Sequence, residues 1–383
     1  MGDESPWLTI SRDAWPEYGE VDIDICSCKE FSQKDAIAFA KQMFQTGDVE
    51  THFVVRGARS LRPETPDPSR YVAALAARRE KQGCAKKKDY DYMNDSLVTQ
   101  FGAPDAPYCD PSTARVTIIP APLEYSVCYM KGTEHGPQAI LNASSQMELY
   151  DEELDWCPNE IGVYTRPSLT YRGMDHATAL TATGEAVREV LQRGQLPFTI
   201  GGEHSLSAPP IAAVREYFPD LTVVHIDAHG DLRNEYEGTL LSHASIERRV
   251  VDMGIPLTEI GVRSFSPEEA EFMKTRPDVA IVWGYQLAKG IATIPWERLS
   301  QHTYVTIDLD ALDPSEMPAV GTPEPGGLHW YQLLDLFREI CRRTTIVGMD
   351  VVELCPIAGQ AHADFLAAKL VYKMVGYRFC EKG

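Results

Sequence analysis

The residues best suited to chemistry in this 383-residue chain are histidines and aspartates that gather in three short groups. The groups occur in the sequences FTIGGEHS, VVHIDAHGD and YVTIDLDALDP. They supply six candidate metal ligands: His204, Asp227, His229, Asp231, Asp308 and Asp310. Mixed imidazole and carboxylate donors suit Mn, Ni, Fe, Co or Zn better than Ca or Mg, and the residue types alone do not choose among these transition metals.

Each group follows a predicted strand, at residues 198–202, 221–227 and 303–310. Ligands of open parallel sheets bind beyond the carboxyl ends of the strands, so the three groups can meet in one crevice. Along an extended backbone, side chains at alternate positions point to one side, which predicts that D-A-H-G-D and D-L-D present their polar side chains together. Several buried carboxylates so close to one another need positive charge, and two divalent cations would provide it.

The elements that would position these residues follow an α/β alternation that begins near Arg115. Short apolar segments, typical of strands buried on both faces, predict strands at 116–122, 198–202, 221–227, 259–262, 279–284, 303–310 and 344–353. Amphipathic segments predict helices between them, at 136–153, 177–194, 243–254, 330–343 and 363–377. This alternation is typical of a parallel sheet covered by helices.

Residues 1–112 are interpreted as an N-terminal extension, and residues 113–383 as the domain that carries the candidate site. The extension contains the proline-rich sequence LRPETPDPSR and a basic run at 86–88. It also contains two helical patterns, at 35–47 and 70–83, each ended by a glycine. We therefore expect the extension to be partly folded.

Composition argues against several classes of partner. The formal net charge of −20 would repel the phosphates of nucleic acids and of anionic membranes. The chain has no basic, apolar leader and no stretch of about 18 apolar residues, which favours a soluble cytoplasmic protein. The nine cysteines are scattered, unlike those of a disulfide framework, and the Cys26 and Cys28 pair lacks a second pair at zinc-finger spacing.

Taken in order, the motifs resemble those of the ureohydrolase family of arginases and agmatinases, and its agmatinase-like branch in particular. They are G-G-E-H-S, D-A-H-G-D-L-R, S-H-A-S, T-I-D-L-D-A-L-D-P and G-M-D-V-V-E, and the similarity runs from about Val116 to Tyr377. The resemblance implies a three-layer α/β/α sandwich around a central parallel sheet, assembled as a homotrimer or homohexamer. It also implies a small cationic guanidino substrate that is hydrolysed to urea.

The resemblance further implies how two divalent ions, Mn or Ni, would be held. One ion would take His204, Asp227, Asp231 and Asp308 as ligands, and the other Asp227, His229, Asp308 and Asp310. Asp227 and Asp308 would then bridge the ions, which lower the pKa of a shared water so that a hydroxide attacks the guanidinium carbon. Asp310 and His243 would deliver the proton that the leaving nitrogen needs. The alternative for His243 is a helix-start residue that faces solvent.

Three residues beyond the ligands are also singled out. The resemblance places Glu353 where a carboxylate forms a paired hydrogen bond with the guanidinium. Trp330, in the turn-rich sequence GTPEPGGLHWY, would pack over the substrate or would only anchor the helix at 330–343. Asp350 is interpreted as a residue that supports the ligands.

The group attached to the guanidino carbon is less well determined. The sequence DLRNEYEGTLLSHAS resembles the agmatinase branch, which disfavours arginine. Related enzymes that hydrolyse free guanidine also have an N-terminal extension, and SLVTQFGAPDAPY is predicted to reach and shorten a neighbouring pocket. Free guanidine or another compact guanidino compound is therefore the first expectation; agmatine, giving putrescine and urea, and guanidinobutyrate are the alternatives. An inactive regulatory subunit is disfavoured because all six ligands, His243 and Glu353 are present.

Overall fold

The computed structural model describes residues 9–15, 20–26, 99–104 and 107–380. The chain divides into two units, Met1–Tyr90 and Asp91–Gly383. In the first, β1 (Thr9–Trp15) and β2 (Glu20–Cys26) form an antiparallel pair. The helices predicted at 35–47 and 70–83 lie outside the described residues, and the domain boundary at residue 112 stays a prediction.

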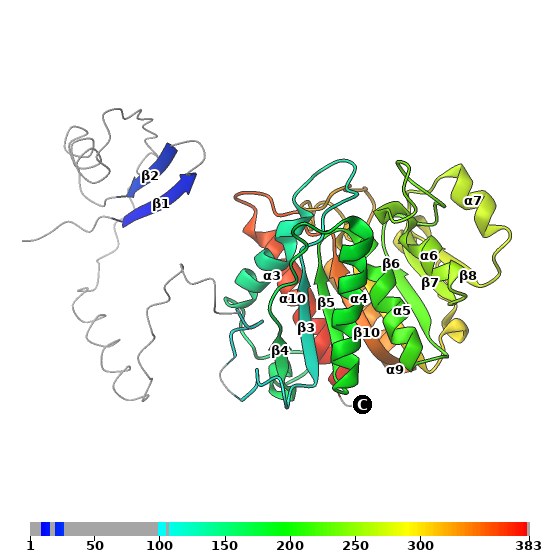
Figure 1. The fold of residues 1–383 in the computed structure, drawn as a ribbon, viewed down its shortest axis with the longest axis horizontal. Helices are drawn as coiled ribbons and strands as arrows, with labels where there is room; N and C mark the ends of the chain where they lie inside the picture. Colours follow the sequence, from blue (N-terminus) through cyan, green and yellow to red (C-terminus); the bar gives the residue numbers. More distant parts are fainter. Residues whose placement is uncertain (1–8, 16–19, 27–98, 105–106, 381–383) are drawn as a thin grey trace, which may run out of the picture. The chain divides into compact units, whose positions relative to one another are not determined.

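The second unit is built on an eight-stranded sheet in the order β4-β3-β5-β10-β9-β6-β7-β8. Every neighbouring pair of strands is parallel, and most strand residues are buried (Figure 1). The strands are β3 (Val116–Ala121), β4 (Val163–Thr165), β5 (Leu196–Gly201), β6 (Thr222–Ile226), β7 (Leu257–Val262), β8 (Val279–Trp283), β9 (His302–Asp308) and β10 (Thr345–Val352). The predicted α/β fold with a central parallel sheet is confirmed.

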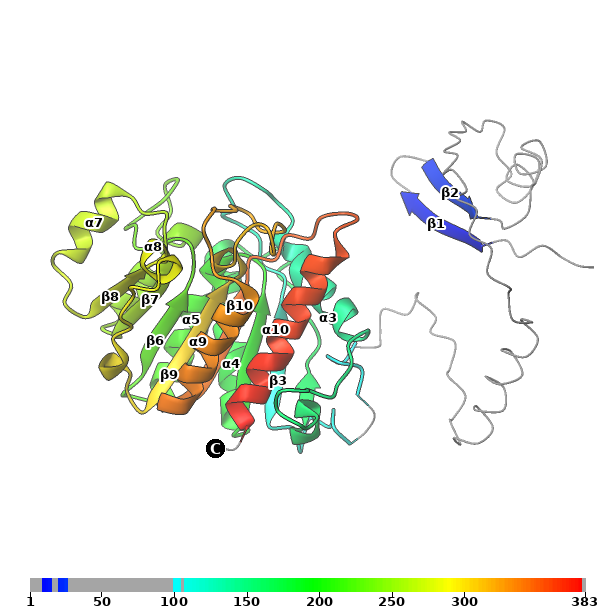
Figure 2. The same ribbon diagram turned by 180° about the vertical axis from the view of Figure 1, so that it is seen from behind.

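Helices cover both faces of this sheet, which gives three layers. One face carries α4 (His176–Gln192), α5 (Ala208–Tyr217) and α6 (Ile246–Asp252) (Figure 1). The opposite face carries α3 (Gly136–Ser144), α9 (Trp330–Arg343) and α10 (Ala361–Phe379) (Figure 2). Two short helices, α7 (Pro267–Met273) and α8 (Gly284–Ala288), lie at the β7–β8 end. In the described part of the chain, no helix is long and apolar enough to cross a membrane.

Two helices differ from the predicted elements. The helix predicted at 136–153 ends at Ser144, and helix α5 was not predicted. The sequence of α5 begins with Ala-Pro-Pro, which looks like a helix breaker. Proline is nevertheless compatible with the first turn of a helix, because the first amide groups have no partner within the helix.

Residues just before β3 contact the outer edge of the sheet. The Gln100 side chain accepts a hydrogen bond from Thr165 N at 2.8 Å and donates one to Thr165 O at 3.0 Å, so it satisfies both backbone groups of one residue of edge strand β4. Phe101 beside it is buried in the core. Residues 100–101 of the sequence SLVTQFGAPDAPY thus contact the sheet of their own chain, and the approach of this sequence to a neighbouring pocket stays a prediction.

Candidate metal centre

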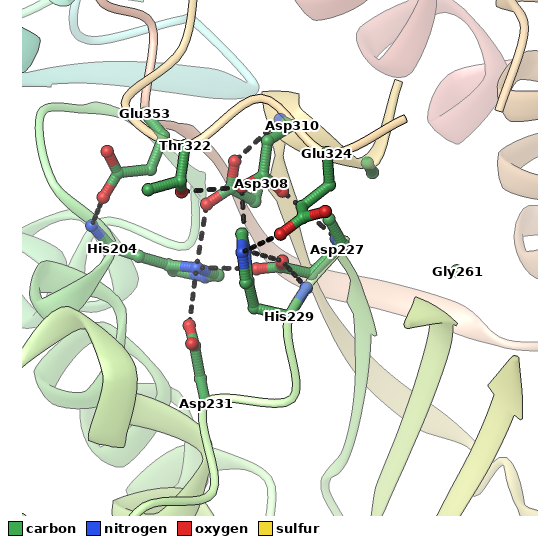
Figure 3. Close-up of polar contacts among 12 residues, drawn as sticks. His204, Asp227, His229, Asp231, Gly261, Asp308, Asp310, Thr322, Glu324 and Glu353 are labelled. Carbon is green, nitrogen blue, oxygen red and sulfur yellow. Dashed lines mark hydrogen bonds and ion pairs between the residues drawn. The ribbon is translucent and has the colours of Figure 1, made fainter. Parts of the chain in front are cut away.

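The candidate ligands follow strands that are neighbours in the sheet. His204 comes after β5, Asp227 after β6, Asp308 ends β9, and Glu353 comes after β10. Because β5, β10, β9 and β6 are consecutive in the sheet, their carboxyl ends bring these side chains together (Figure 3). The six predicted ligands and Glu353 thus form one cluster, as the predicted strand-end convergence requires.

The local backbone is not the extended one that the alternating spacing suggested. Strand β6 ends at Ile226, and Asp231 has φ +49°, a left-handed conformation. Asp310 lies in a 3₁₀ turn, Leu309–Ala311, where its amide donates to Asp308 Oδ1 at 2.8 Å. Alternation along a strand was therefore the wrong reason for the convergence. Tight turns after the strands aim the side chains instead.

The first donor group surrounds His204. Its Nδ1 lies 3.1 Å from Asp227 Oδ2, 3.4 Å from Asp231 Oδ2 and 3.4 Å from Asp308 Oδ2. All four side chains are buried or nearly so. One imidazole nitrogen and three carboxylate oxygens directed at one another are a suitable set for a divalent transition metal.

The second donor group surrounds His229. Its Nδ1 lies 2.9 Å from Asp310 Oδ2 and 3.4 Å from Asp227 Oδ1. Asp227 therefore belongs to both groups, with Oδ2 toward His204 and Oδ1 toward His229 (Figure 3). A carboxylate that offers one oxygen to each group is placed to bridge two ions.

His204 itself fits a metal ligand. Thr306 Oγ1 donates its only proton to Asp350 Oδ1 at 2.6 Å and must accept the hydrogen of His204 Nε2 at 2.9 Å. In the neutral ring, Nδ1 is then the unprotonated nitrogen, and within the described residues it has no hydrogen-bond partner although it is fully buried. A bare ring nitrogen facing three carboxylates is the form in which histidine binds a metal. Asp350, interpreted from the sequence as a supporting residue, lies behind this contact.

Charge and burial act strongly on the carboxylates. Burial, with Asp310 and Asp227 close by, raises the pKa of Asp308 well above its usual range. Burial and Asp227 also raise the pKa of Asp310. For Asp227 itself, burial is outweighed by His225 and His204, which lower its pKa. Bound cations would relieve the mutual repulsion of these acids.

His225 is a functional candidate that the sequence reasoning missed. It lies on β6, fully buried, and its Nε2 is 2.8 Å from Asp227 Oδ2. Its ring atoms are close enough to those of His204, Asp227 and Asp231 to be counted among possible ligands. We assign it instead to orienting Asp227, because it already shares a hydrogen bond with that carboxylate. A buried histidine two positions before Asp227 was the available signal.

Arg263 was also missed. Its guanidinium donates to the backbone carbonyls of Asp310 at 2.7 Å and of Glu324 at 2.8 Å. These two carbonyls belong to the turn after β9 and to the loop that brings Thr322 and Glu324 to the site (Figure 3). Arg263 therefore ties together two segments that shape the site. Nothing in the local sequence around residue 263 indicates this role.

A cavity of about 190 Å³ adjoins the donor groups. It is lined by ligands from both groups, and also by Glu353, His243, Arg233, Tyr236 and the segment Val127–Met130. Glu353 Oε1 accepts a hydrogen bond from His204 N at 2.6 Å, and burial raises the pKa of Glu353 to about 8. Trp330 does not line this cavity. It begins α9 and packs against the hydrophobic core.

Comparisons with known proteins agree with this geometry. Residues 114–376 match the sequence profile described as Arginase family, and residues 9–57 match that of S-adenosylmethionine decarboxylase. The chain is 38% identical to N(1)-aminopropylagmatine ureohydrolase from Synechocystis sp., over 69% of this chain and 89% of that protein. It is 32% identical to agmatinase from Bacillus anthracis, over 68% and 91% respectively. The agmatine ureohydrolase structure from Thermoplasma volcanium matches with TM-score 0.64 and 27% identity, over 74% and 94%.

Proposed function

Because this chain belongs to the arginase family and is a ureohydrolase of its agmatinase-like branch, we propose that it removes urea from an alkylguanidine with an amine at its far end. The observation that carries the proposal is the pair of donor groups that share Asp227 beside a cavity containing Glu353 and His243. Urea and the corresponding amine are the products. A small cationic substrate also suits the acidic site.

We assign the two donor groups to two divalent ions, Mn or Ni. The assigned ligands are the six predicted ones: His204, Asp227, His229, Asp231, Asp308 and Asp310. When bound, such ions lower the pKa of a water and so supply the nucleophile. The protein's contribution is to hold the donors in fixed places, and Asp227 joins the two groups because each of its oxygens faces one histidine.

Three residues act on the substrate in this proposal. Glu353 binds the guanidinium, since a carboxylate matches the planar pair of N–H donors and a nearby cation favours its ionised form. Asp310 holds a proton released from the attacking water. His243, on the cavity wall, passes a proton to the leaving nitrogen, which otherwise would depart as a poorly stable amide anion.

The names of the relatives support an order among the candidate substrates. Those quoted above are called N(1)-aminopropylagmatine ureohydrolase, agmatinase and agmatine ureohydrolase, so we place these two aminoalkylguanidines first. Free guanidine, the first expectation from the sequence, becomes the second candidate. The small volume of the cavity, about 190 Å³, favours keeping it, because a compact guanidino compound needs no further space.

A urea-release assay on the purified chain tests the proposal. The protein is loaded with Mn or Ni and supplied with N(1)-aminopropylagmatine, agmatine, guanidinobutyrate, arginine and guanidine. We expect the highest kcat/KM with one of the two aminoalkylguanidines. Guanidine with the highest kcat/KM would instead support the second candidate, and no urea from any compound would contradict both. Native mass measurement on the same sample tests the implied homotrimer or homohexamer.

A further inference from the structure

We propose that Ser126 is a positioning residue that fixes the tautomer of His243, with its own hydroxyl locked by Glu203. The inference rests on the proposed function, in which His243 passes a proton to the leaving nitrogen. Ser126 lies in the loop after β3, and Glu203 follows β5, directly before the ligand His204. Ser126 lies outside the quoted sequence motifs, and Glu203 belongs to G-G-E-H-S but was given no role there.

Glu203 is a saturated, fully buried acceptor. Its Oε1 accepts hydrogen bonds from Ser126 Oγ at 2.8 Å and from Ser205 Oγ at 2.5 Å. Its Oε2 accepts from the backbone amides of Tyr125 at 2.5 Å and of Ser126 at 2.6 Å. A carboxylate only accepts, so the single proton of the Ser126 hydroxyl is committed to Glu203.

This commitment determines what Ser126 can offer to His243. With its proton spent, Ser126 Oγ can only accept, and His243 N donates to it at 3.0 Å. The His243 ring nitrogen Nδ1 lies 3.3 Å from the same oxygen. If Nδ1 were unprotonated, its lone pair would face a lone pair of Ser126 Oγ, and the two would repel each other. Counting hydrogens therefore places a proton on Nδ1.

A second hydroxyl provides the competing arrangement. Ser242 Oγ lies 3.4 Å from His243 Nδ1 and accepts from Ala244 N at 3.2 Å. Its own proton is free, so Ser242 alone could donate to Nδ1 and move the ring hydrogen to Nε2. The closer oxygen of Ser126, which cannot donate, opposes this arrangement. Ser126 therefore favours the Nδ1–H tautomer of His243 and Ser242 the Nε2–H tautomer, which makes Ser242 a matched control.

The Nδ1–H tautomer leaves Nε2 as the basic nitrogen. Within the described residues no hydrogen bond to His243 Nε2 is found, and the His243 side chain lines the cavity. A proton taken up at Nε2 can pass to the leaving nitrogen. The hydrogen bound to Nδ1 remains there and continues to donate to Ser126 Oγ. The ring then returns to the same neutral tautomer after each turnover. Ser126 acts through His243 and does not touch the substrate.

Two substrates with different leaving groups test the proposal. Agmatine releases an alkylamine, which needs protonation, whereas its oxyguanidine analogue releases a less basic alkoxyamine and needs much less help. We expect Ser126→Ala to lower kcat about tenfold for agmatine with little change in KM, and about twofold or less for the analogue. Ser126→Thr keeps the hydroxyl and should restore most of the rate. Ser242→Ala should leave both rates within about twofold.

Several outcomes would overturn the assignment of Ser126. They are equal losses on the two substrates, a Ser242→Ala variant that behaves like Ser126→Ala, or additive losses in Ser126→Ala/His243→Asn. Urea release from none of the compounds of the assay above in the metal-loaded wild type would instead refute the proposed function. In Ser126→Ala the backbone amides that bind Glu203 remain, and metal content and the thermal midpoint verify folding.

A measurement on the wild type keeps the proposal testable if Ser126→Ala does not fold. Chain labelled with ¹⁵N-histidine and loaded with diamagnetic Zn gives ring-nitrogen signals, and those of His243 are identified by their loss in His243→Asn. We expect a proton bound to Nδ1 and none to Nε2 in the neutral ring. The reverse assignment would refute the role of Ser126.

Discussion

At the scale of single residues, Asp227 is the member that joins the two donor groups, one oxygen toward each histidine. We expect Asp227→Asn to lower kcat by at least about 100-fold and to reduce bound metal, because an amide nitrogen cannot replace a carboxylate oxygen as a ligand. Urea release and metal content after desalting measure both effects. Asp220→Asn, at a side chain 47% exposed, is the control. A fully metal-loaded and active Asp227→Asn would remove Asp227 from the ligand set.

Glu353 allows the charge of the substrate site to be tested separately from its shape. Glu353→Gln keeps an oxygen that can accept from His204 N but loses the negative charge opposite the guanidinium. We expect kcat/KM to fall roughly 100-fold, with metal content unchanged. The exposed substitution Glu297→Gln should have no effect. Unchanged kinetics in Glu353→Gln would show that the guanidinium binds elsewhere.

The six candidate ligands were predictable because their residue types stand out in the sequence and each group follows an apolar segment. Their supporting contacts were not. Ser126 meets His243 across 117 positions, and His204 meets Thr306 across 102 positions. Serine and threonine are common, so no local pattern marks the few that touch a catalytic ring. Only the folded structure shows which hydroxyls donate their single proton to a buried carboxylate.

At the scale of elements, α10 is anchored by a buried ion pair. Lys373 Nζ donates to Asp151 Oδ1 at 2.9 Å, and the two side chains are 6% and 1% exposed. We expect Lys373→Met to lower the free energy of unfolding by roughly 3–5 kcal/mol, because Asp151 would remain buried without its cation. Urea denaturation measures this loss. Lys369→Met, at a less buried position on the same helix, should change it far less.

The same ion pair gives a pH dependence with a definite sign. Burial lowers the pKa of Lys373, but hydrogen bonding and charge at Asp151 outweigh burial and raise the pKa above its usual 10.5. Because the lysine pKa is raised in the folded state, the ion pair contributes its full stabilisation at pH values below 10.5. This contribution disappears as the pH rises through the folded-state pKa. The stability difference between wild type and Lys373→Met should therefore shrink in alkali. A constant difference up to about pH 12 would contradict the assignment.

Strands were easier to predict than turns. The apolar segments around β5, β6, β9 and β10 are marked by buried, largely β-branched residues, and the structure confirms these strands. The short strand β4 has only three residues and gives no such pattern. The positive φ angles of Asp231 and Glu353 could not be predicted either, since packing imposes them on residues that do not favour them.

At the scale of the whole molecule, bound metal should stabilise the folded chain. Ions that bind the native cluster and not the unfolded chain add free energy by mass action, about 4 kcal/mol at 1,000 times the dissociation constant. We expect a thermal midpoint about 10 °C higher with Mn than after treatment with a chelator. The difference should be much smaller in Asp227→Asn. Equal midpoints for the wild type with and without Mn would contradict a metal site in the buried cluster.

The catalytic unit should act without the preceding residues. The family match covers residues 114–376, and 68–74% of this chain matches 89–94% of the length of the relatives quoted above, so we expect residues 1–90 not to be needed for the fold. We expect the fragment 91–383 to fold and to keep kcat/KM for its best substrate within about threefold. Urea release and the thermal midpoint measure this. A folded fragment that releases no urea would contradict this independence from residues 1–90.

The layered α/β class was predictable from alternating segments, but the order of the strands was not. In the sheet, β10 lies between β5 and β9, although β5 and β10 are separated by more than 140 residues of sequence. Pairing between such distant strands depends on how the helices pack across both faces. The sequence alone carries no local signal for it.

That strand order has a consequence for how the protein is made. The candidate ligands and Glu353 follow strands that leave the ribosome at different times, with His204 first and Glu353 last. A nascent chain that has reached only β9 lacks the strand that belongs between β5 and β9, so the two cannot yet hold their final spacing. In the proposed function, the two ions can therefore be held in the native arrangement only after β10 has joined the sheet. Cells that restrict metal supply after synthesis would accumulate a complete but unloaded protein.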